Sequence, residues 1–206
     1  MRHFRALPLL AVMAATPVLA AVPLDGWGAY KFGLSPDAAR AIPGHSFRAY
    51  SAKNLWNENK GAMGATTHPK INGVTYDFNL YFDDGSKLNG IELENEKKNV
   101  TLSDCGNAFL TLLGQQQKDY GAFAPVSPER KRDTSQTPPT SVEWKTEGGS
   151  RYELATLTLA DEYAYAWRAR KSAGANYLEV QATWSAHPDS KTAACVTGIK
   201  YAGKKS

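Results

Sequence analysis

Histidine is the residue type through which this chain could most readily bind a metal ion. Beyond position 20 the histidines are His45, His68 and His187, and the last two directly precede a proline. A metal site needs ligands at short helical or strand spacing, and the chain contains no His-x-x-x-His pattern. The sequence therefore predicts surface-loop histidines, with neither a metal ion nor another cofactor.

Serine and paired carboxylates are the next candidates for catalytic chemistry. A nucleophilic serine needs a base and a constrained turn such as Gly-x-Ser-x-Gly, and this sequence has no such turn. Two carboxylate pairs, Asp83-Asp84 and Asp161-Glu162, fall between predicted strands, where acidic residues are common and solvated. The sequence therefore favours a protein that is not an enzyme. An active site assembled only by the folded chain, as in an unrecognised hydrolase, is the alternative.

The glycine-rich stretch at residues 26–40 could cradle a phosphate, because free N–H groups before a helix attract anions. Here Ser35-Pro36-Asp37 provides an N-cap, a proline at the first helical position and an acidic residue in the first turn. Asp37 places negative charge where a phosphate would lie. We therefore expect these glycines to serve packing and not anion binding.

An aromatic stripe offers a candidate binding surface. Tyr163, Tyr165 and Trp167 alternate along one predicted strand, with Arg168 on its other face. Such alternation is typical of a buried strand face. Tyr, Trp and Arg are also enriched at interface hot spots, so the same four residues are the candidate binding residues of this chain.

The two cysteines predict a structural disulfide. Cys105 and Cys195 form no Cys-x-x-Cys motif, and a bond between them would close a loop of about 90 residues. After Thr101, apolar residues follow helical spacing up to Gly121, and Cys105 shares a stripe with Phe109. We expect the Cys105 thiol to point into the core, where a strand carrying Cys195 could meet it.

The first 20 residues predict export. Arg2 and Arg5 precede a short apolar run, and Val18-Leu19-Ala20 suits signal peptidase. Cleavage there leaves 186 residues with a side-chain charge of +2, and nothing else in the chain is apolar enough to cross a membrane. We expect a periplasmic or secreted protein whose Cys pair oxidises on export.

Residue patterns predict an α+β fold, with short helices packed on an antiparallel sheet. Val74 to Phe82 alternates as a half-buried strand, and residues 83–86 turn into a returning strand over 87–94. Further strands are predicted at 142–146, 151–159, 162–170, 177–184 and 195–201, with a turn at Gly148-Gly149. Residues 45–69 show little periodicity and predict a long loop or a weak helix around 53–59.

The predicted elements form two loosely similar halves, each opening with a helix and continuing into antiparallel strands with a Gly-containing turn. Residues 21–124 form a helix-hairpin-helix half, 125–141 a long polar loop, and 142–206 an antiparallel β half, together in one continuous domain. Whether the halves share one sheet stays open at this point. The basic run at 130–132 is short and lies between acidic residues, which favours a solvated loop over nucleic-acid binding.

Two short motifs carry a family resemblance. Residues 32–38 (FGLSPDA) open a short helix, and residues 76–82 (YDFNLYF) with 84–88 (DGSKL) form a hairpin. This order resembles small exported bacterial domains of the β-lactamase-inhibitor-protein type and the small lipoprotein of outer-membrane barrel assembly. The resemblance covers residues 27–93, with a looser match at 105–120. It implies a protein-binding module without an active site, although the chain has no lipoprotein cysteine after the predicted cut.

The sequence therefore predicts an exported, non-enzymatic binding protein with an envelope or secreted protein as partner. The alternative is a pocket between helix and sheet for a small apolar or sugar ligand. Burial separates the two: an exposed stripe at Tyr163, Tyr165 and Trp167 favours a partner, whereas a closed cavity favours a ligand.

Overall fold

The computed structural model describes residues 22–49, 61–126, 141–145, 151–159, 162–186 and 193–203. Of these, 141–145, 151–159 and 162–165 are described by their backbone alone. The predicted signal peptide, the basic run at 130–132 and the Gly148-Gly149 turn lie outside the described residues. The same applies to the weak helix predicted around 53–59.

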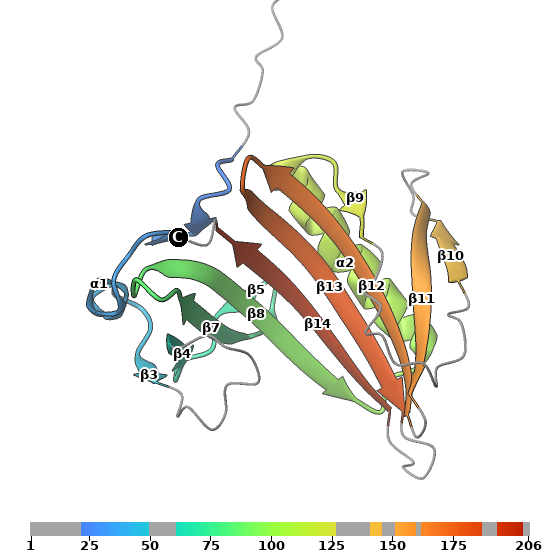
Figure 1. The fold of residues 1–206 in the computed structure, drawn as a ribbon. Coiled ribbons are helices and arrows are strands. Elements are labelled where there is room, and N and C mark those ends of the chain that lie inside the picture. Colours follow the sequence, from blue (N-terminus) through green and yellow to red (C-terminus); the bar gives the residue numbers. More distant parts are fainter. Residues whose placement is uncertain are drawn as a thin grey trace, which may run out of the picture.

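One large antiparallel sheet dominates the described part of the chain (Figure 1). Its strand order is β10-β11-β12-β13-β14-β8-β7-β4-β3, and the short β9 pairs with β12 beside β11. The strands are β3 (Phe47–Ala49), β4 (Gly61–Ala65), β7 (Asp77–Phe82), β8 (Leu88–Lys98), β9 (Ala124–Pro125), β10 (Ser141–Lys145), β11 (Arg151–Leu159), β12 (Glu162–Ala173), β13 (Asn176–Ala186) and β14 (Ala193–Ala202).

Within the described residues, two helices and two small hairpins accompany the large sheet. The helices are α1 (Pro36–Arg40) and α2 (Leu102–Tyr120), and the hairpins pair β1 (Gly26–Trp27) with β2 (Tyr30–Lys31) and β5 (Lys70–Ile71) with β6 (Val74–Thr75). The helices pack with antiparallel strands, which confirms the predicted α+β class.

The strands of the two predicted halves belong to one continuous sheet. β14 pairs with β8 from Ala194 opposite Lys98 to Ala202 opposite Gly90. Loop 83–86 joins β7 to β8 as predicted, since the Asp83 and Lys87 backbones bond across it and the Asp83 carboxylate accepts from the Lys87 N–H at 2.9 Å. Strand β8 therefore lies between β14 and β7 in the interior of the sheet.

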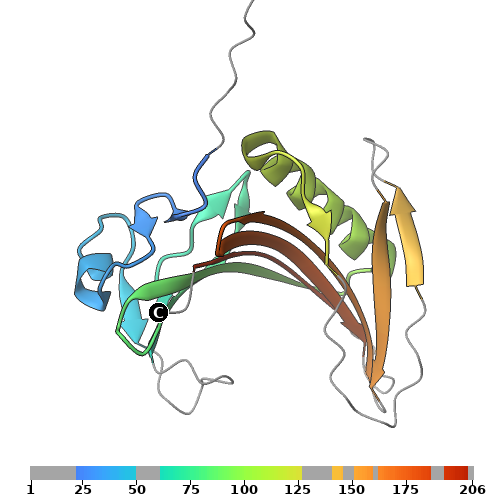
Figure 2. The ribbon, with the colours of Figure 1, turned by 45° about the horizontal axis from the view of Figure 1, so that its top comes forward.

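Helix α2 covers one face of the curved sheet, and the described chain places no helix on the other (Figure 2). Its apolar stripe, which includes Cys105, Phe109 and Leu112, is buried against β12, β13 and β14. Thr101 caps the helix by accepting from the Asp104 N–H at 3.1 Å, and the helix ends before Gly121. Caps and apolar spacing therefore predicted this helix correctly.

The glycine-rich N-terminal stretch packs against the core. Ser35 caps α1 by accepting from the Ala38 N–H at 3.2 Å, with Pro36 and Asp37 in the first turn as predicted. Before the helix, the Tyr30 ring packs edge-on against Phe78 at 5.0 Å. A Cβ at Gly26 would overlap the Tyr30 carbonyl oxygen, so this glycine permits the close turn between β1 and β2.

The structure corrects the prediction of a long loop at residues 45–69. Strands β3 and β4 lie in this region and extend the sheet beyond β7. Strand β4 reads Gly-Ala-Met-Gly-Ala and is buried on both faces, so it shows no alternation of large apolar and polar residues. Periodicity cannot detect a short strand of small residues whose partners supply the packing.

Candidate functional site

Two of the four candidate binding residues, Trp167 and Arg168, have described side chains, and these lie on opposite faces of the sheet as predicted. Trp167 is 1% exposed and stacks near Phe109 of α2, with ring centroids 6.4 Å apart. Arg168 is partly exposed and lies on the opposite face. Tyr163 and Tyr165 pair with Ala186 and Trp184 through their backbones, and their side chains lie outside the described part of the chain. The core interpretation therefore applies to Trp167.

A groove of about 450 Å³ lies between α2 and the β5–β6 hairpin, on the face of the sheet that α2 covers. Figure 2 shows the hairpin beside the helix. Strands β8 and β14 form the floor of the groove. It is lined by Ile71, Asn72, Val74, Tyr76, Asn95, Lys97, Asn99, Val100, Asp104, Ala108, Thr111, Leu112, Gln115, Cys195 and Thr197. The volume falls in the range of small-molecule sites, about 300–1,000 Å³.

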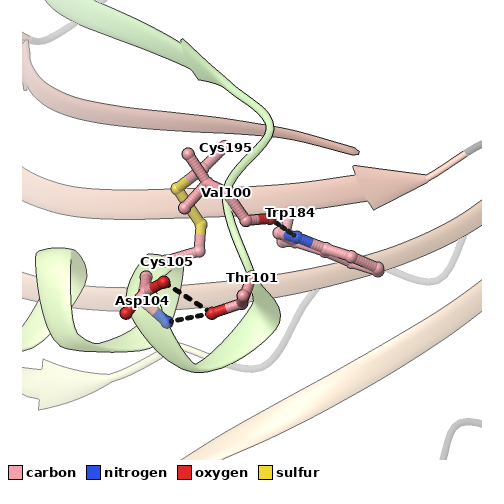
Figure 3. Close-up of a disulfide and its surroundings, with 6 residues drawn as sticks. All are labelled: Val100, Thr101, Asp104, Cys105, Trp184 and Cys195. Atoms are coloured by element: carbon pink, nitrogen blue, oxygen red, sulfur yellow. Dashed lines mark hydrogen bonds between the residues drawn. A yellow bond between two sulfur atoms is a disulfide. The ribbon is translucent and has the colours of Figure 1, made fainter. Parts of the chain in front are cut away.

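The first turn of α2 is held to the groove floor by a disulfide (Figure 3). Cys105 and Cys195 are bonded, with their Cα atoms 5.6 Å apart, which confirms the predicted pair. Beside the bond, the Trp184 Nε1–H donates to the Val100 carbonyl oxygen at 2.7 Å. These two connections fix where the helix begins relative to β13 and β14.

The last turn of α2 is also attached to the sheet. The hydroxyl oxygens of Tyr120 and Tyr201 lie 3.4 Å apart, and the two rings meet edge-on. Burial first, and this hydrogen bond second, raise the pKa of Tyr201, so its hydroxyl remains neutral and can take part in the bond at any ordinary pH. With both ends attached, α2 provides a rigid wall for the groove.

The β5–β6 hairpin forms the second wall. Its turn residues Asn72 and Gly73 both have positive φ, at 50° and 81°, as a two-residue type I′ turn requires. At the base of the hairpin, the Asn95 Nδ2–H donates to the Thr75 carbonyl oxygen at 2.9 Å. Asn95 itself lines the groove, so one side chain both holds this wall and faces the ligand space.

Carboxamide side chains are the most frequent polar groups of the lining. They are Asn72 on the hairpin turn, Asn95 in β8, Asn99 after β8 and Gln115 in α2. Among the residues that the structure describes, none hydrogen-bonds the side chains of Asn72, Asn99 or Gln115. Each carboxamide offers a donor and an acceptor to a ligand.

The opposite face of the sheet carries paired charged and polar groups. Arg170 donates through Nε and Nη2 to Glu179 Oε2 at 2.9 and 2.7 Å, and Glu179 is 3% exposed. The Tyr81 hydroxyl donates to Glu92 at 2.7 Å, and Gln181 reaches the same carboxylate at 3.5 Å. These contacts hold long side chains flat against strands β7, β8, β12 and β13.

Glu94 on this face has a raised pKa. Burial is the largest cause, the carboxylates of Glu92 and Asp77 add to it, and Lys200 opposes it, so the pKa rises to about 7. Asp77 lies directly opposite Glu94 in the β7–β8 register and also bonds His68 at 3.0 Å. Two acidic residues opposite each other on paired strands repel when both are ionised.

Replacing Glu94 with glutamine is expected to raise stability at pH 8 and leave it unchanged at pH 4. An unfolded chain ionises Glu94 above about pH 4.5, whereas the folded chain keeps its proton up to about pH 7. Folding stability therefore falls as pH rises through this window. After solvent screening we expect a gain of about 1–2 kcal/mol from Glu94→Gln at pH 8. Urea unfolding of both proteins at pH 4, 6 and 8 measures it, and equal gains at all three values would contradict the assignment.

The described residues contain no group of three or more His, Cys, Asp or Glu side chains placed to hold a metal ion. Neither helix within the described ranges combines the length and apolar composition needed to cross a bilayer. Comparisons with protein-family models, curated proteins and solved structures found no match. The groove and the uncovered sheet face are the two candidate binding regions of the described chain.

The sequence predicted a pocket between helix and sheet as an alternative, but it identified none of the residues that line the groove. Its lining comes from four separate segments, at residues 71–76, 95–104, 108–115 and 195–197. The Asn72-Gly73 pair between Ile71 and Val74 was the one local signal, because Asn-Gly flanked by apolar residues strongly predicts a hairpin. No local pattern predicts that this hairpin lies beside α2.

Proposed function

We propose that this chain is a non-enzymatic binding protein whose ligand occupies the groove between α2 and the β5–β6 hairpin. The observation that carries the proposal is the groove itself: about 450 Å³ of space whose lining includes carboxamides that no described residue hydrogen-bonds. A site with a rigid wall and available polar groups binds with little loss of conformational entropy. The burial of Trp167 adds support, since it removes one aromatic residue from the predicted partner surface.

The proposal also includes the cellular compartment in which the protein acts. The Cys105–Cys195 disulfide indicates a location outside the cytoplasm. We propose that the first 20 residues direct export to the periplasm or the medium, where the groove meets its ligand.

A protein partner on the uncovered sheet face is the second candidate. The observation that favours it is the set of charged groups already held in fixed pairs, such as Arg170 with the buried Glu179. Side chains fixed before binding lose little entropy at an interface. Arg168 lies on this face and remains a candidate binding residue. In this second proposal the chain itself acts as an inhibitor-like or envelope-assembly-like protein.

Filling the groove should abolish ligand binding without unfolding the protein. Ala108 is half-buried in the α2 wall, so Ala108→Phe places a ring in the ligand space. Fragment binding to the isotope-labelled full chain, followed by NMR, is expected to shift the amide signals of Asn72, Asn99 and Gln115 and to disappear in Ala108→Phe.

Asn107→Phe is the matched control, because Asn107 is the exposed neighbour of Ala108 and does not line the groove. This variant should bind fragments as the unmodified chain does. Shifts confined to the uncovered face around Glu92 and Lys200 would remove the groove as the ligand site and leave the partner candidate.

A further inference from the structure

We propose that the ligand of the groove is a neutral oligosaccharide, an inference that rests on the proposed function of the groove as a binding site. The hydrogen-bonding groups of the lining carry the first step. Asn72, Asn95, Asn99 and Gln115 come from the hairpin, the sheet and the helix, so they surround the space from three sides. Sugar hydroxyls donate and accept at once, and carboxamides match both roles.

The hydroxyl groups of Thr111 and Thr197 add to this set. Both threonines line the groove, Thr111 from α2 and Thr197 from β14, where it is buried. A threonine hydroxyl donates one hydrogen bond and accepts others. The Thr111 hydroxyl already donates to the Asn107 carbonyl oxygen at 2.8 Å, so it offers a ligand an acceptor. A ligand with many hydroxyls can therefore pair with side chains on the wall and on the floor together.

The charge of the lining favours a neutral ligand. Its two charged side chains are Lys97 and Asp104, whose charges balance, and a carboxylate oxygen of Asp104 already accepts from the Thr101 hydroxyl at 2.7 Å. Recognition of a phosphate or carboxylate relies on Arg forks or clustered cations. The described lining contains no arginine and one lysine, so an anionic ligand would find a single cation to offset its lost hydration.

The apolar side chains of the lining also suit an oligosaccharide. Ile71 and Val74 of the hairpin face the groove, and Ala108 and Leu112 line it from the helix. Pockets that select small molecules combine an apolar lining with a few placed polar groups. The C–H faces of sugar rings can pack on these side chains while their hydroxyl edges reach the carboxamides.

Titration calorimetry of the full chain tests the ligand class. The probes are maltotriose, cellotriose and triacetylchitotriose as neutral trisaccharides, glucose 6-phosphate as an anionic sugar and trialanine as a peptide. We expect saturable binding of at least one neutral trisaccharide and none of the other two probes. Gln115→Ala and Asn72→Gly should each weaken that binding about three- to tenfold, since each removes one hydrogen-bonding group.

Both substitutions spare the backbone, because alanine favours a helix and glycine accepts the positive φ of Asn72. Asn107→Ala removes an exposed carboxamide of α2 outside the groove and should bind as the unmodified chain does. Failure of all three trisaccharides at about 10 mM, or binding that ignores the groove variants, overturns the ligand class. If fragments still bind in the groove, the proposed function stands without this ligand class. If neither trisaccharides nor fragments bind there, the proposed function is overturned as well.

Discussion

Replacing both Cys105 and Cys195 with alanine is expected to lower the free energy of unfolding by about 4 kcal/mol. The bond joins residues 90 positions apart, so its loss frees a long loop in the unfolded chain. In the folded chain both cysteines are almost fully buried, between the first turn of α2 and strand β14. Urea unfolding monitored by tryptophan fluorescence measures the change.

The unmodified chain provides the matched comparison, unfolded with and without a thiol reductant. Reduction should shift its transition toward that of the double alanine variant and leave the variant itself unchanged. The groove should also weaken, because Cys195 lines it and the bond sets the position of the α2 wall. Coincident transitions of the oxidised and reduced chain would contradict a stabilising disulfide.

The disulfide and its helix also show which features local sequence patterns can predict. Helical spacing placed Cys105 on the stripe of Phe109 and Leu112, and caps at Thr101 and Gly121 set the ends of α2. These signals act within one element, where backbone hydrogen bonds and side-chain spacing are fixed by the helix itself. Alternation over residues 74–82 located β7 but placed its start too early, because Val74 and Thr75 form β6 and pair with β5. The turn at residues 83–86 located β8, which pairs with β7.

Features that depend on contacts between distant segments were not predictable from the sequence. The pairing of β14 with β8, which joins the two halves, brings together strands that are far apart in the sequence and that no turn connects. Strand β4 was predicted as loop because its glycines and alanines carry no alternation. The groove is a further case, since it exists only where the β5–β6 hairpin and α2 lie side by side above the sheet.

The candidate binding residues show that a strand pattern does not reveal which face of the strand is buried. Alternation alone placed Trp167 and Arg168 on opposite faces of one strand, and it could not tell which face is covered. The covered face is the one that holds Trp167, because α2 packs over it. Arg168 lies on the uncovered face as a result, with the paired side chains of β8 and β13.

Replacing Trp167 with alanine is expected to cost about 3–5 kcal/mol of stability, as removal of a large buried aromatic side chain usually does. Trp167 is 1% exposed and stacks near Phe109 in α2, so its loss leaves a cavity between helix and sheet. Arg168→Ala is the matched control at the next position of β12. Because Arg168 is partly exposed, its substitution should change stability by no more than about 0.5 kcal/mol.

Thermal and urea unfolding of the two variants measure this difference, and binding assays then separate the two functional candidates. If a partner docks on the uncovered face, Arg168→Ala should weaken its binding although the protein stays folded, because Arg168 lies on that face. Binding of a groove ligand should be unaffected by Arg168→Ala. A Trp167→Ala variant that keeps full stability but loses a partner would contradict the buried position of Trp167 and restore the aromatic stripe as a binding surface.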